Sequence, residues 1–130
     1  MLASSLGSKH RQGVISVVPE TDGIVAVCLK GEFDMATERV LGDQVDRALE
    51  SGDNLILHLS EATFIDSSVI GVLMRAVKVA GGRKQTMVLQ LGTASIVERV
   101  FEITRIEQVL PRAHDRQEAV RMIQEKPVAL

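Results

Sequence analysis

Apolar and polar positions near the start of the chain form two short runs that predict a β-hairpin. Val14–Val18 and Ile24–Lys30 are rich in β-branched residues, which favour strands. Pro19–Gly23, which separates them, has the composition of a turn. Residues 1–12 combine Ser, Gly and basic residues without periodicity. We therefore expect a flexible N-terminal tail, followed by a single domain over residues 13–126.

Beyond the hairpin, segments with helical spacing alternate with short apolar runs. After Gly31–Asp34, the apolar positions predict a helix that ends near Glu50, with Asp34 or Thr37 as its N-terminal cap. The later predicted elements are a strand over Leu55–Leu59, a helix from Ser67 to Gly81 and Gly82, a strand over Met87–Leu91, a helix near Ser95–Thr104, a brief strand near Gln108–Leu110 and a last helix over about Arg116–Lys126. This order predicts an α/β fold: a mixed β-sheet of about four to five strands, parallel through its βαβ units and covered by about four α-helices.

Composition and charge exclude several classes of function. The net charge of −2 and the aromatic content of 2% argue against nucleic-acid binding, anionic lipid and an aromatic-lined ligand pocket. The single cysteine, Cys28, rules out an internal disulfide, and we expect it to pack as a small apolar side chain. No second His or acidic residue stands at metal-ligand spacing from His58, so we expect a structural His58 and neither metal nor cofactor. Without a secretory signal or a long apolar segment, we expect a cytoplasmic protein with no membrane insertion.

The segment Asp66-Ser67-Ser68 carries the most informative chemistry in the chain. It stands where a predicted parallel strand ends and a helix begins, the place where α/β folds usually carry function. Asp and Ser are common helix N-caps, so a structural role explains the pattern on spacing alone. The alternative is a phosphorylation site, at which the added charge would be repelled by Asp66 and would spoil a partner surface. An enzymatic nucleophile is disfavoured because the G-x-S-x-G elbow is absent and no His has an evident route to Ser68.

Two further patterns carry weaker signals. Arg75, Lys78, Arg83 and Lys84 form a modest basic cluster, which we interpret as a solvated helix face, with a docking patch as the alternative. The glycine pair after this helix ends it, whereas the glycines of a dinucleotide-binding fingerprint open a helix. A nucleotide-binding domain is therefore disfavoured.

Three stretches, taken in order, make the chain similar to a STAS domain, the family of sulfate transporters and anti-sigma factor antagonists, and in particular to its stand-alone bacterial antagonists. Gly31-Glu32-Phe33-Asp34 with Thr37 resembles the family's Gly-Glu-Leu-Asp plus Thr element. Leu55–Leu59 followed by Phe64–Gly71 resembles its strand and Asp-Ser-Ser-Gly-Leu-Gly element. The run from Met87 to Val109 resembles its late strand–helix–strand pattern.

The resemblance implies an anti-sigma factor antagonist controlled by phosphorylation. It implies that the unphosphorylated domain binds an anti-sigma factor with serine kinase activity and frees a sigma factor, that this kinase phosphorylates Ser68, and that a phosphatase reverses the modification. The expected partner-binding residues are Gly31, Glu32, Asp34, Thr37, Asp66, Ser67, Ser68, Val69 and Arg75. Val69 stands where the family usually has Gly, a departure that favours the alternative of a non-switching STAS interaction module in a stress-signalling or lipid-transport assembly.

Overall fold

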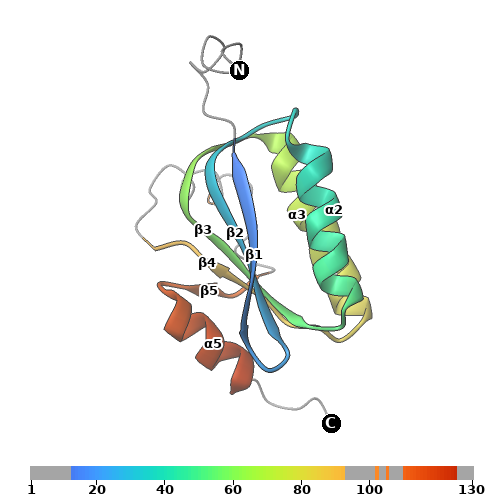
Figure 1. Cartoon of the computed structure of the whole chain (residues 1–130), viewed down its shortest axis with the longest axis vertical. Helices are drawn as coiled ribbons and strands as arrows, with labels where there is room; N and C mark the ends of the chain where they lie inside the picture. Colours follow the sequence, from blue (N-terminus) through green and yellow to red (C-terminus); the bar gives the residue numbers. More distant parts are fainter. Residues whose placement is uncertain (1–12, 93–101, 103–104, 106–109, 126–130) are drawn as a thin grey trace.

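The sheet is an antiparallel hairpin to which parallel strands are added on one side. The computed structural model describes residues 13–92, 102, 105 and 110–125, and its strand order is β1-β2-β3-β4-β5 (Figure 1). The strands are β1 (Val14–Thr21), β2 (Ile24–Phe33), β3 (Asn54–Ile65), β4 (Met87–Gln90) and β5 (Arg112–Ala113). β1 pairs with β2 in antiparallel orientation, and every later pair is parallel. The predicted mixed sheet with an N-terminal hairpin is confirmed.

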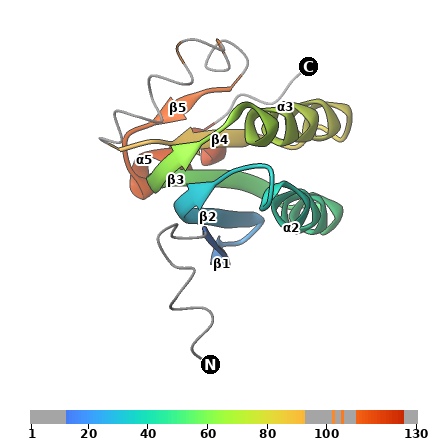
Figure 2. The ribbon, with the colours of Figure 1, turned by 90° about the horizontal axis from the view of Figure 1, so that it is seen from above.

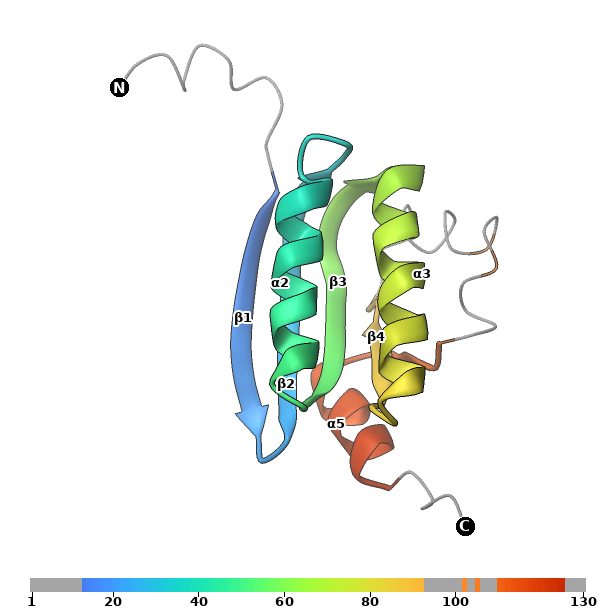
Figure 3. The same ribbon diagram turned by 90° about the vertical axis from the view of Figure 1, so that its right-hand side faces the viewer.

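Helices cover both faces of this sheet. α2 (Glu38–Glu50) and α3 (Ser67–Gly82) lie side by side on one face, and α5 (Arg116–Gln124) packs on the other (Figure 2, Figure 3). β3 contributes to both cores because the side chains of a strand alternate between the faces of its sheet. Leu55 and Leu57 pack with the α2 and α3 side chains, whereas Ile56 packs with α5.

β3 is longer than its apolar run predicts, since it passes Leu59 and ends at Ile65. Two register shifts against β2 accommodate the additional residues. As a result the two strands end together, with Phe33 paired to Ile65. The loops that follow these two strands therefore meet at one edge of the sheet.

β1 is also longer than predicted, because it continues through Pro19 to Thr21. Proline is tolerated there since β1 is an edge strand, in which an N–H is not needed on the outer side. Only Asp22 and Gly23 then turn the chain, and Gly23 has a positive φ of 76°, a conformation that glycine adopts without steric cost.

Most of the strand predicted near Gln108–Leu110 lies outside the described residues. Of that range the structure describes only Leu110, which lies in a bend, and β5 follows at Arg112–Ala113. Main-chain hydrogen bonds attach this segment to β4 and its end, because Leu89 N donates to Pro111 O and Leu91 N donates to Ala113 O. Apolar periodicity does not reveal this main-chain pairing.

The helices agree with their predicted starts more closely than with their predicted number. α5 begins at Arg116 as expected, but it ends at Gln124, with Glu125 as its C-cap. Three helices are described, against about four predicted; of the helix predicted near 95–104 only Glu102 lies within the described residues. Within the described ranges, no helix combines the length and apolar character that a bilayer crossing requires.

Candidate functional site

Asp66 caps the N-terminus of α3. Its backbone is extended, and its Oδ1 accepts hydrogen bonds from Ser68 N at 3.0 Å and Val69 N at 3.2 Å. The Ser68 hydroxyl donates to the same oxygen at 2.6 Å. Of the three polar residues at this strand end, Asp66 is therefore the cap, and it fixes the position of the Ser68 side chain.

The second oxygen of Asp66 joins α3 to the loop that follows β2. Met35 N donates to Asp66 Oδ2 at 3.1 Å, and Asp66 N donates to Phe33 O at 3.2 Å. One carboxylate thus links two segments that are far apart in the sequence. We call these segments, Asp34–Thr37 and Asp66–Ser68, the Ser68 surface.

The loop Asp34–Thr37 is closed by its own side chains. Thr37 Oγ1 accepts from Asp34 N and donates to Asp34 O, each at 2.9 Å. Asp34 Oδ1 accepts from Ala36 N at 2.9 Å. The prediction of Asp34 or Thr37 as the cap of α2 is confirmed in position, because Thr37 is the N-cap residue, but the expected side-chain bond is absent. The Thr37 hydroxyl is used within the loop instead.

The hydrogen bonds around Asp66 favour its ionised form. Burial acts to raise the pKa of this carboxyl, but the bonds from the Ser68 hydroxyl and from the Val69, Ser68 and Met35 N–H groups together lower it below its usual value. The Ser68 surface therefore carries a fixed negative charge beside the Ser68 hydroxyl at neutral pH.

The predicted partner-binding residues divide between the surface and the core. Asp34 and Ser67 are exposed, and Gly31, Glu32, Thr37, Asp66 and Ser68 are half-buried. Val69 is 0% exposed and packs in the core under α3, so its side chain offers no contact to a partner. Arg75 is exposed on α3, where its guanidinium passes close to Gly42 of α2.

Exposed apolar side chains lie within the Ser68 surface or a few residues from it in the sequence, and sequence reasoning missed them. Met35 in the loop is 74% exposed, Val40 in α2 is 54% exposed and Phe64 near the end of β3 is 45% exposed. Apolar side chains of this size on a polar surface are typical of protein–protein contacts. The sequence feature that could have revealed this exposure is Met35, a large apolar residue in a turn whose other residues are small or polar.

Gly71 is a second residue that the sequence reasoning did not single out. It is exposed in the interior of α3, one helical turn after Ser67, and a Cβ added to it would meet no atom within 4 Å. Glycine destabilises a helix interior, and the space around Gly71 would admit a larger residue. The fold therefore gains no stability from glycine at this position.

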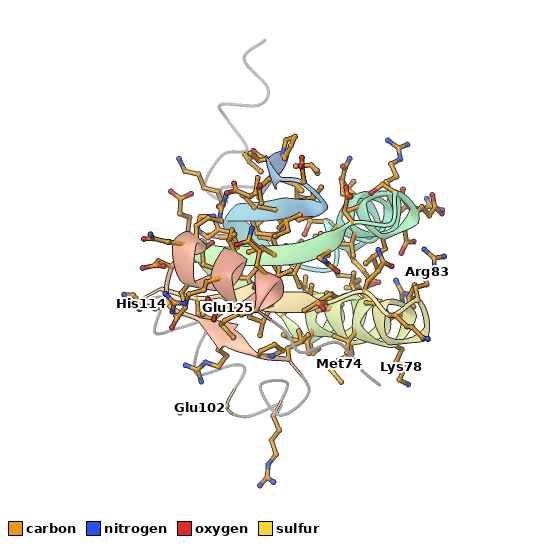
Figure 4. All side chains as sticks on the ribbon, turned by 90° about the horizontal axis from the view of Figure 1, so that it is seen from below. Met74, Lys78, Arg83, Glu102, His114 and Glu125 are labelled. Carbon is orange, nitrogen blue, oxygen red and sulfur yellow. The ribbon has the colours of Figure 1, made fainter. Side chains whose placement is uncertain are left out.

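The predicted basic cluster does not form one patch. Lys78 and Arg83 point to opposite sides of α3 (Figure 4). Arg75 lies along α2, and Lys84 follows the end of the helix. This arrangement agrees with a solvated helix face.

A polar network on the opposite face of the sheet ties α5 to the strands. Arg116 Nε donates to Gln90 Oε1 at 2.7 Å. One terminal nitrogen of Arg116 contacts His58 Nδ1 at 2.8 Å and Cys28 Sγ at 3.4 Å, and the other terminal nitrogen forms an ion pair with Glu20. His58 Nε2 contacts the Ser60 hydroxyl. Burial and the nearby Arg116 charge lower the pKa of His58, although Glu61 and Glu20 oppose them. These contacts confirm that His58 is structural.

The chain is similar to proteins of one family along most of its length. The family model described as "Mlab, STAS domain" matches residues 16–111. A STAS-domain containing protein of Pseudomonas aeruginosa is 26% identical over 96 residues, which cover 73% of this chain and 94% of that protein. An anti-sigma factor antagonist from Mycobacterium paratuberculosis superposes with a TM-score of 0.75 at 21% identity, over 88% of this chain and 96% of that chain. The Bacillus cell fate determinant SpoIIAA in its phosphorylated form gives a TM-score of 0.67 at 18% identity, over 85% and 99% of the two chains.

Proposed function

Because the chain belongs to the STAS domain family, we propose that it is an anti-sigma factor antagonist whose Ser68 surface binds an anti-sigma factor with serine kinase activity. Binding occupies the anti-sigma factor and frees a sigma factor in the cytoplasm. Phosphorylation of Ser68 ends the binding, and a phosphatase restores it. The observation that carries the proposal is the hydrogen bond from the Ser68 hydroxyl to Asp66, the carboxylate that joins the two segments of this surface.

The charge around Ser68 indicates how a phosphate would act there. Phosphorylation removes the hydroxyl proton that Ser68 donates to Asp66 and adds a charge of about −1.5 to −2 beside that carboxylate. No Lys or Arg of the described residues bonds to either side chain, so repulsion from Asp66 is not offset within this part of the chain. The repulsion pushes Asp66 away from Met35 N and α3, and the surface changes its shape as well as its charge.

A second support is the combination of charge and apolar exposure on this surface. A partner that accommodates Met35 and a neutral Ser68 would have to desolvate a dianion after phosphorylation. A buried charge without a counter-charge costs several kcal/mol, which is enough to abolish micromolar binding.

Incubation with the cognate kinase, ATP and Mg²⁺, followed by mass spectrometry of the peptides, tests the proposal. We expect one phosphate on Ser68, none in Ser68→Ala, and unchanged labelling in Ser67→Ala, the exposed neighbour that makes no bond to Asp66. We further expect Ser68→Glu to bind the anti-sigma factor at least tenfold more weakly than wild type. Phosphate on another residue, or wild-type binding by Ser68→Glu, would contradict the switch.

A second candidate function is a non-switching STAS module that binds its partner constitutively. One observation favours it: the Ser68 hydroxyl already has a structural partner in Asp66. In this case Ser68→Ala and Ser68→Glu would both copurify with the same partner as wild type does. A partner that phosphorylates Ser68 would exclude this second function.

A further inference from the structure

One side chain supplies the polar attachment of α5 to the sheet. Arg116, the first residue of α5, donates to Gln90 on β4 and to Cys28 on β2, contacts His58 on β3 and forms an ion pair with Glu20 on β1. One guanidinium group therefore reaches four of the strands. A change in any of these contacts would act directly on the position of α5.

The other attachments of α5 to the sheet are apolar. Ala119 and Ile123 are buried against the strands, and Val120 and Met122 pack beside them. Figure 4 shows α5 against the strands of this face. These side chains belong to a smaller core than the one under α2 and α3. Release of Arg116 would therefore weaken the hold on α5 and leave the larger core in place.

The contact with Arg116 fixes the protonation state of His58. A guanidinium nitrogen only donates, so His58 Nδ1 accepts from Arg116 and carries no proton. The proton of the neutral ring is then on Nε2, which donates to the Ser60 hydroxyl. A further proton has to enter at Nδ1, 2.8 Å from the guanidinium nitrogen. Two donors and two positive charges would then face each other, and the contact would break.

Charged groups from several elements act on His58. Besides Arg116 of α5, the groups near His58 are Glu61 and Ser60 on its own strand, Glu20 on β1, Cys28 on β2 and Gln90 on β4. The two carboxylates raise the pKa of His58, whereas burial and the Arg116 charge lower it and outweigh them. The ring is therefore neutral at neutral pH, which is the state that the Arg116 contact requires.

We propose that the contact between His58 and Arg116 is a pH-sensitive latch on α5, closed while His58 is neutral and opened when Nδ1 takes up a proton. One proton enters from the solvent for each opening and returns to it on closing. When the latch opens, Arg116 keeps Glu20 as its counter-charge, and the first turn of α5 moves away from β3. The latch lies on the face of the sheet opposite α2 and α3 and needs no partner, so it is independent of the Ser68 surface.

Amide hydrogen exchange of the full chain, followed by NMR between about pH 7 and pH 5, tests the latch. Protection factors correct for the intrinsic effect of pH on exchange. They should fall by about fivefold or more at the Ala119 and Ile123 amides as His58 becomes protonated. They should fall less at the Leu41 and Leu73 amides, which belong to the core under α2 and α3, because the opening is local.

Three substitutions separate the latch from a general effect of acid. His58→Gln keeps a neutral polar side chain that takes up no proton, so α5 protection should no longer change with pH. Arg116→Gln should raise the pKa of His58 in an NMR titration, because the neighbouring positive charge is removed. Arg121→Gln is the matched control, since Arg121 is exposed in the same helix and pairs with Glu118; it should respond to pH as wild type does.

Four results would overturn the latch. The first is α5 protection that is the same at both ends of the pH range, and the second is an equal loss of protection in α5 and in α2 and α3, because the opening would then not be local. The third is a pH response that persists in His58→Gln, which would assign it to another group. The fourth is an unchanged pKa of His58 in Arg116→Gln, because the two side chains would then not be coupled.

Discussion

Replacing Gly71 with alanine should stabilise the fold and weaken partner binding at the same time. Gly71 lies in the interior of α3 and is exposed, and an added Cβ meets no atom within 4 Å, so the methyl group causes no strain. In a helix interior, alanine is more stabilising than glycine by about 0.5–1 kcal/mol. The free energy of unfolding should rise by this amount, and the melting temperature by about 2–5 °C.

The loss of binding follows from the position of Gly71 relative to the Ser68 surface. Gly71 follows Ser67 by four residues and Ser68 by three, so all three share one side of α3. A partner seated on Ser68 then approaches the α3 main chain most closely at Gly71. A methyl group inserted into such a contact costs about 1–3 kcal/mol, which is roughly tenfold or more in affinity.

Urea and thermal unfolding followed by circular dichroism give the stability, and calorimetry with the cognate anti-sigma factor gives the affinity. Gly81→Ala is the matched control, because Gly81 is in the same helix with equally open space but far from Ser68. It should raise or maintain stability and leave affinity unchanged. Wild-type affinity in Gly71→Ala would refute the placement of the partner, and a loss of stability would refute the argument from open space.

Three further predictions concern stability. Asp66→Ala should lower the free energy of unfolding by about 1–2 kcal/mol, because α3 loses its cap. It should also speed hydrogen exchange at the Met35 amide, which loses its acceptor; an unchanged exchange rate at Met35 would contradict the link between the two segments. Val69→Gly, which introduces the usual family residue, should lower the free energy of unfolding measured in urea by about 3 kcal/mol, because the Val69 side chain is 0% exposed. Wild-type stability of this variant would contradict the prediction. The pKa of His58 is lowered from 6.5, so the unfolded chain binds more protons than the folded one below that pH. Stability should therefore fall as the pH drops from about 6.5 towards the folded-state pKa, and the fall should be shallower in His58→Gln.

The parts of the fold that depend on local pattern were predictable, and those that depend on distant contacts were not. The hairpin and the starts of α3 and α5 follow from apolar periodicity and capping chemistry. The extension of β3 to Ile65 does not, because polar residues interrupt its pattern and only pairing with β2 maintains the strand. Likewise, Asp34 and Thr37 have the composition of a helix cap, but they bond to each other within a loop whose position is fixed by Asp66.

The same distinction applies to the candidate site. The sequence identified Asp66, Ser67 and Ser68 because strand ends and helix starts can be located from local signals. It did not identify Met35 as a neighbour, because that contact joins residues 31 positions apart. Val69 is the opposite case. The family resemblance placed it among the partner-binding residues, but it is buried, because the first turn of α3 directs its side chain into the core.

The burial of Val69 bears directly on the proposed switch. A β-branched residue next to Ser68 would hinder a kinase only if its side chain stood beside the hydroxyl or if the main chain needed a conformation that valine resists. Here the side chain is in the core and the main chain is regular helix. The departure from glycine therefore affects the stability of α3 more than access to Ser68. The feature that governs the response to a phosphate is then Asp66, because the same carboxylate caps α3, holds Met35 N and accepts the hydroxyl that phosphorylation would remove.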